Sequence, residues 1–107
     1  MKTFGQIIAE ARKALGLSQK DLAAKTRKED GESISPQYLN DIEHDRRDPP
    51  SEFIIEKFAK NLKLPKEHLI AAAGLWPSDL RDKLPGADPK KVEEAFTAFR
   101  KVLKDKS

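Results

Sequence analysis

The sequence predicts an all-helical protein, and three observations support that fold class. Apolar residues recur every three or four positions in successive short segments, which is the spacing that lines one face of a helix. No stretch alternates β-branched and polar residues as a half-buried strand does. Capping residues precede most of these segments, and Gly or Pro follows them. A chain of 107 residues has room for one domain and an appended helix.

The first three helices are predicted from their start signals. Thr3 and Gln6 form a capping-box pair, in which each side chain satisfies a backbone donor of the other. Ser18 can cap the second helix. Ser35 precedes Pro36, and proline is favoured at the first helical position. We therefore expect helices over residues 4–15, 19–25 and 36–44.

The later elements follow the same rules. Ser51 caps a fourth helix, Gly74 ends a fifth, and Asp88 caps a long last helix. Residues 78–84 are expected to add one or two further turns. Residues 85–87, Pro-Gly-Ala, form the clearest linker. The three main helices are expected over residues 52–62, 66–73 and 89–104.

The linker divides the chain into a predicted first domain, residues 1–84, and a C-terminal segment, residues 85–107. Apolar residues of the last helix are spaced four, three and four apart, which keeps one seam on a facing helix. This predicted seam consists of Val92, Phe96, Phe99 and Leu103. It can fold back onto the first domain or meet a second copy of the chain, and we expect a homodimer.

Composition sets limits on function. The formal charge is +3, with nine basic and nine acidic residues in the first 50 positions, so no strongly basic face is visible in bulk. The absence of cysteine excludes disulfides and thiolate metal sites. No apolar run approaches the roughly 20 residues that cross a bilayer. We expect a cytoplasmic protein without a metal, a cofactor or a catalytic group, because no nucleophile–histidine–carboxylate grouping or phosphate-binding loop is present.

Residues 17–51 carry the functional signal. Two short capped helices followed by a basic, proline-stopped turn make a helix-turn-helix candidate. On a helical wheel one side of residues 36–44 is the core side, with Tyr38, Leu39 and Ile42. The opposite side carries Gln37, Asn40 and His44. Amide side chains suit base reading, because they donate and accept hydrogen bonds together.

Three segments carry a resemblance to a known family: Leu17-Ser18-Gln19-Lys20-Asp21-Leu22-Ala23, Ile34-Ser35-Pro36-Gln37-Tyr38-Leu39-Asn40-Asp41-Ile42-Glu43 and Arg46-Arg47-Asp48-Pro49-Pro50-Ser51. In this order they resemble the phage-repressor-like (Cro/C1-type, XRE) helix-turn-helix family. The resemblance covers about residues 3–80. It implies a five-helix lambda-repressor-like DNA-binding domain, here with an additional C-terminal amphipathic helix.

The resemblance also implies roles for individual residues. The third helix would be the recognition helix in the major groove. Positions that usually face bases are Pro36, Gln37, Asn40 and Asp41. Gln19 would anchor to a phosphate and brace the third helix, and Arg46 and Arg47 would grip the DNA backbone. Arg12 and Glu43 match a buried salt bridge. The predicted contact set is completed by Lys20, Ser35, Tyr38 and His44.

The sequence departs from the family pattern at three places. The turn between the second and third helices is several residues longer, and its Arg27 and Lys28 either reach phosphates or lie on tolerated surface. Pro36 cannot make a polar contact with a base, so only van der Waals contact is available there. Asp45 stands where the family usually has Gly, and Asp can adopt the left-handed conformation at some cost.

The leading functional hypothesis is a sequence-specific regulator of transcription, a repressor, that binds double-stranded DNA at an inverted-repeat operator. An alternative is an antitoxin-type protein that binds a partner through its C-terminal helix and regulates its own operon. A third is a domain that has lost DNA binding and docks only to protein. An enzyme is the least expected class.

Overall fold

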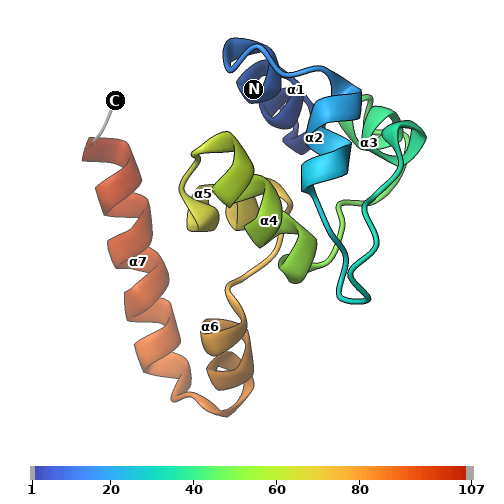
Figure 1. Cartoon of the computed structure of the whole chain (residues 1–107). Helices are drawn as coiled ribbons and strands as arrows, with labels where there is room; N and C mark the ends of the chain where they lie inside the picture. Colours follow the sequence, from blue (N-terminus) through green and yellow to red (C-terminus); the bar gives the residue numbers. More distant parts are fainter. Residues whose placement is uncertain (1, 106–107) are drawn as a thin grey trace. The chain divides into compact units, whose positions relative to one another are not determined.

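A computed structural model describes residues 2–105, and helices dominate this part of the chain (Figure 1). The α-helices are α1 (Phe4–Ala14), α2 (Gln19–Lys25), α3 (Pro36–Glu43), α4 (Glu52–Leu62), α5 (Lys66–Ala72), α6 (Ser78–Lys83) and α7 (Pro89–Asp105). A 3-10 turn, η1 (Leu84–Gly86), follows α6. The predicted all-helical class is confirmed. None of the helices within residues 2–105 is long and apolar enough to span a membrane.

The chain divides into two compact units, Met1–Leu75 and Trp76–Ser107. The sequence-based division at residues 84 and 85 left α6 with the first domain, whereas the structure groups it with α7. The reason is apolar packing: the ring of Trp76 meets that of Phe96 edge-on, with centroids 5.4 Å apart. Leu80 and Leu84 line the same apolar cleft as Phe96.

The first unit is built around one apolar core to which all five of its helices contribute. Its largest fully buried apolar side chains are Ile8, Leu22, Leu39, Ile42, Ile55, Phe58, Leu69 and Ile70. These are residues at helical spacing, so burying them fixes which side of each helix faces inward. Burial of each such side chain contributes about 1.5–3 kcal/mol.

Side-chain caps fix where the helices begin. The predicted capping box of Thr3 and Gln6 is present at α1. Ser18 and Ser35 cap α2 and α3 by accepting a hydrogen bond from the third backbone N–H of each helix. At α2, Asp21 completes a second capping box by accepting from the Ser18 backbone. This bond and the one with the Ser18 side chain lower the pKa of Asp21.

The connection between α2 and α3 is a small ordered hairpin rather than an irregular loop (Figure 1, teal). Arg27 and Ser33 form an isolated antiparallel bridge, and the Lys28 N–H donates to the Glu32 carbonyl at 2.8 Å. Gly31 turns the chain with φ of 87°. The residues of this hairpin are exposed, as predicted, but their backbone is held by its own hydrogen bonds.

The start of α1 lies against the end of α3, and Gly5 makes this approach possible. A Cβ at position 5 would collide with the carbonyl of Ile42 and lie 2.7 Å from that of Glu43. Asp45 has the predicted left-handed conformation, with φ of 56°. Its carboxylate accepts from the Gly5 N–H at 3.1 Å and from the Thr3 hydroxyl at 2.5 Å.

Gly5→Ala is expected to lower the free energy of unfolding by about 1–3 kcal/mol, because the added methyl group must push α1 away from α3. Urea unfolding followed by circular dichroism measures the change. Gly86→Ala is the control, since a Cβ there meets nothing within 4 Å. Equal stability of the two variants would contradict the close contact at Gly5.

Candidate nucleic-acid interface

The predicted recognition helix, α3, has one buried side and one polar side. Leu39 and Ile42 are buried in the core. On the other side Gln37 and His44 are exposed, and Asn40 is half-buried. The sidedness predicted from the helical wheel is therefore confirmed, with one refinement: Tyr38 lies half-buried at the boundary between the two sides.

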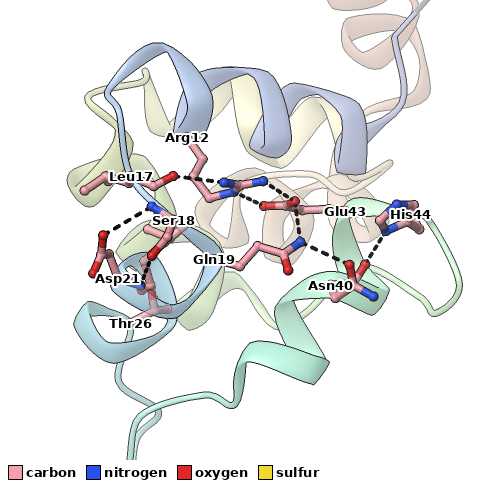
Figure 2. Close-up of polar contacts among 10 residues, drawn as sticks. Arg12, Leu17, Ser18, Gln19, Asp21, Thr26, Asn40, Glu43 and His44 are labelled. Atoms are coloured by element: carbon pink, nitrogen blue, oxygen red, sulfur yellow. Dashed lines mark hydrogen bonds and ion pairs between the residues drawn. The ribbon is translucent and has the colours of Figure 1, made fainter.

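A buried ion pair joins α1 to α3 (Figure 2). Arg12 Nε lies 2.6 Å from Glu43 Oε2, and Arg12 Nη2 lies 2.9 Å from Glu43 Oε1. The side chains are only 10% and 3% exposed. The hydrogen bonds that Arg12 donates to Glu43 raise the pKa of Arg12, whereas burial lowers it. Arg12 Nη1 also donates to the Leu17 carbonyl at 2.9 Å, so the predicted salt bridge is present and extends to the start of α2.

Gln19, the first residue of α2, braces α3 through its amide (Figure 2). Its Nε2 donates to Glu43 Oε1 at 2.9 Å and to Asn40 Oδ1 at 3.1 Å. The predicted bracing role is therefore confirmed. Both amide hydrogens are engaged in these bonds, so a phosphate contact from Gln19 in this arrangement has to come from its backbone N–H at the start of α2.

A second polar cluster lies at the outer edge of α3. Asp41 Oδ1 accepts from Gln37 Nε2 at 3.0 Å and from Arg46 Nε at 3.1 Å. The Arg46 N–H also donates to the Asp41 carbonyl at 2.9 Å. Asp41 was predicted to face bases, and here it holds the two side chains beside it.

The remaining predicted contacts surround this helix. The guanidinium of Arg47 lies over the Tyr38 ring, 4.7 Å from its centroid. His44 Nδ1 lies 2.8 Å from the Asn40 carbonyl, which can only accept, so Nδ1 carries the proton. Lys20, Pro36 and Arg46 are exposed, whereas the Ser35 hydroxyl is occupied in capping Tyr38 N–H at 3.0 Å.

The two basic residues of the hairpin have different contacts. Arg27 Nη1 donates to the Gly31 carbonyl at 2.9 Å, which stabilises the turn itself. Lys28 lines a pocket together with Ser35 and Tyr38. Of the two, Lys28 is therefore the residue that lies beside the start of α3.

Asn61 of α4, which bonds to the end of α2, was not predicted from the sequence. Its Nδ2 donates to the Lys25 carbonyl at 3.2 Å and to Thr26 Oγ1 at 3.3 Å, which closes the C-terminal end of α2. A half-buried Asn next to the apolar stripe of α4 was the signal that could have revealed it.

The predicted C-terminal seam belongs to the second unit. Val92 and Phe96 are half-buried, whereas Phe99 and Leu103 are 53% and 59% exposed. Phe99 also lines the apolar cleft that contains Trp76. Within the second unit, the outer half of this seam is therefore uncovered.

Comparison with known proteins identifies the family. A family model described as Helix-turn-helix matches residues 8–69, which include α2, the hairpin and α3. The chain belongs to the Cro/C1-type (XRE) helix-turn-helix family. The resemblance to this family that was read from the sequence is therefore confirmed.

Several relatives of this helix-turn-helix protein are known. It is 35% identical over 89 residues to the uncharacterized HTH-type transcriptional regulator RghRB of Bacillus subtilis (strain 168), which covers 80% of this chain. The chain spans 60% of the length of that relative. The crystal structure of the master regulator for biofilm formation SinR in complex with DNA matches with a TM-score of 0.54 and 31% identity, over 64% of this chain and 98% of the other.

The SinR protein/SinI protein complex also matches this family member, with a TM-score of 0.54 and 28% identity. It covers 96% of this chain and 99% of the other. The match to the protein complex extends into α6 and α7.

Arg12→Met is expected to cost about 3–5 kcal/mol of stability, because it leaves the Glu43 carboxylate buried without a cation. Urea unfolding at neutral pH measures the loss. The double variant Arg12→Met/Glu43→Leu is expected to recover most of it, since an apolar pair of similar volume replaces the ion pair. A loss below about 1 kcal/mol in the single variant would show that the pair behaves like an exposed one.

Proposed function

We propose that this protein is a sequence-specific repressor of transcription that reads double-stranded DNA with α3 in the major groove. The observation that carries the proposal is the polar side of α3, where Gln37 and Asn40 are held in place by neighbouring side chains. Amides held in this way have little conformational entropy left to lose on binding, which favours a specific contact.

The proposed contacts fall into two classes. Gln37 and Asn40 pair with base edges, and Pro36 contacts an apolar group such as a thymine methyl. Phosphates are bound by exposed cations around α3, which position the protein without reading sequence. We assign this role to Lys20, Arg46, Arg47 and the hairpin residue Lys28, with His44 and the Tyr38 hydroxyl at the margin.

We further propose that the protein binds an inverted-repeat operator as a homodimer in the bacterial cytoplasm, without a cofactor or a catalytic step. Two-fold operators place half-sites one helical turn apart, so a dimer presents two recognition helices at the right spacing. In this proposal the first unit would supply the reader, and α7 of the second unit would supply the dimer contact.

The exposed seam of α7 supports a second copy as its occupant. Phe99 and Leu103 leave apolar surface open. The same flank of this seam carries Glu93 and, two turns later, Arg100. In an antiparallel two-fold pair centred near Phe96, Glu93 of each copy faces Arg100 of the other, so the charges are complementary.

The alternative is a different protein partner. The solved complex of SinR with SinI shows that a similar chain is found with a second protein. In the antitoxin version of this alternative, the α7 seam would bind a toxin while α3 represses the operon. A chain that sediments as a monomer, with a toxin gene beside its own, would favour this version.

Phe99→Asp is expected to convert the dimer to a monomer and to weaken operator binding at least about tenfold, because each half-site then binds alone. Sedimentation equilibrium measures the mass of the species. Ala98→Asp is the control, since residue 98 is exposed on another side of α7 and receives the same charge. A wild-type monomer at micromolar concentration would contradict the homodimer.

Gln37→Ala and Asn40→Ala are each expected to reduce the preference for operator over random DNA by about 1–3 kcal/mol. Arg46→Ala is expected to weaken both kinds of binding alike and to lower the salt slope by about one unit. Fluorescence anisotropy at several salt concentrations separates the two effects. An unchanged operator preference in both amide variants would mean that α3 is not the reader.

A further inference from the structure

The two amides on α3 differ from free surface amides because each has one end held by a neighbouring side chain. An amide accepts through its oxygen and donates through its nitrogen, so its orientation decides which base edge it can pair with. A freely rotating Gln or Asn can present either end. Orientation is therefore a determinant of specificity in its own right.

The orientation of Asn40 follows from the buried ion pair. The Glu43 carboxylate, paired with Arg12, can only accept hydrogen bonds. The end of Gln19 that approaches Glu43 must therefore be Nε2, as observed at 2.9 Å. That nitrogen also lies 3.1 Å from Asn40, where its partner has to be an acceptor, Oδ1. Asn40 thus turns Oδ1 toward Gln19 and Nδ2 away from it.

The orientation of Gln37 follows from Asp41 by the same rule. Asp41 Oδ1 accepts a hydrogen bond from Arg46 Nε at 3.1 Å, and an ionised carboxylate is acceptor-only. Gln37 accordingly directs Nε2 toward Asp41, at 3.0 Å. Because the amide is planar, Oε1 is then the end turned away from Asp41.

We propose that Asp41 and Glu43 are positioning residues that fix the hydrogen-bond polarity of the reading face, with the acceptor of Gln37 and the donor of Asn40 presented to DNA. The inference rests on the proposed reading of the major groove by α3. The base opposite Gln37 has to offer an exocyclic amine, which adenine and cytosine do. The base opposite Asn40 has to offer an acceptor, such as guanine O6 or N7 or thymine O4.

A simpler role for Asp41 would be to hold Arg46 alone. If Asp41 only held Arg46, altering Asp41 would change phosphate binding alone. The affinity for DNA would then change by the same factor for every sequence. The positioning role predicts a change at one base. Asp41→Asn separates the two, because Asn has nearly the same shape but can face Gln37 with either an oxygen or a nitrogen.

The experiment selects bound sequences from a random duplex pool at near-physiological salt for the wild type, Gln37→Ala and Asp41→Asn. The position that loses its preference in Gln37→Ala marks the base read by Gln37. At that position the wild type is expected to favour adenine or cytosine by about tenfold, within the range of one good base contact. Asp41→Asn is expected to reduce this preference to about twofold or less and to keep the preferences at the other positions.

A charge-matched rescue makes the test specific. In Asp41→Asn/Gln37→Glu the net charge is that of the wild type, and the new Glu is acceptor-only, so it again presents an acceptor to the base. The preference for adenine or cytosine at the marked position is expected to return. Thermal unfolding of each variant checks that the fold is unchanged, since Asp41 and Gln37 lie outside the core.

Two results would overturn the inference while leaving the proposed function in place. One is an Asp41→Asn variant that keeps the wild-type preference at the marked position. The other is an Asp41→Asn variant that loses preference equally at all positions. A wild type that enriches no sequence would overturn the proposed function and this inference together.

Discussion

The buried carboxylate of Glu43 is the group on which the arrangement of the first three helices depends. An ionised carboxylate removed from water is tolerated only when donors surround it. Here the donors come from two other helices, Arg12 of α1 and Gln19 of α2. Since Glu43 itself ends α3, satisfying one buried charge requires all three helices to meet in one geometry.

Two kinds of interaction position the polar side of α3: one decides which side of the helix is exposed, and the other orients the individual side chains. The apolar core, through residues such as Leu39 and Ile42, decides which side of α3 is exposed. Hydrophobic burial is not directional, so it cannot set the orientation of an amide. Hydrogen bonds are directional, and those of Gln19 and Asp41 set the orientation of the two amides. A reading helix needs both, because a base edge distinguishes a donor from an acceptor.

Much of the fold was predictable because its signals are local. Ser18 and Ser35 start helices by bonding to backbone groups three residues away, and helical spacing of apolar residues marks the core side. The ion pair of Arg12 with Glu43 was recognisable only through the resemblance to a family. Composition alone would have missed the function, since the net charge of +3 is modest.

What the sequence did not reveal depends on contacts between distant segments. The close approach at Gly5 is visible only once the end of α3 is placed beside it. The same holds for Asn61, which bonds to α2 from α4, and for the grouping of Trp76 with α7. The partners of Asp41 lie within five residues, but many rotamers of Gln37 and Arg46 compete, so spacing alone does not select the observed bonds.

The measurement that tests the central claim most directly is a crystal structure of the full chain bound to its selected operator. The account predicts α3 in the major groove, with Arg12, Glu43, Gln19 and Asn40 joined by the same hydrogen bonds as in the free protein and Asn40 Nδ2 on a base acceptor. A complex in which α3 lies outside the groove would contradict it. So would one in which Gln19 leaves Glu43 and Asn40 turns its oxygen to the DNA.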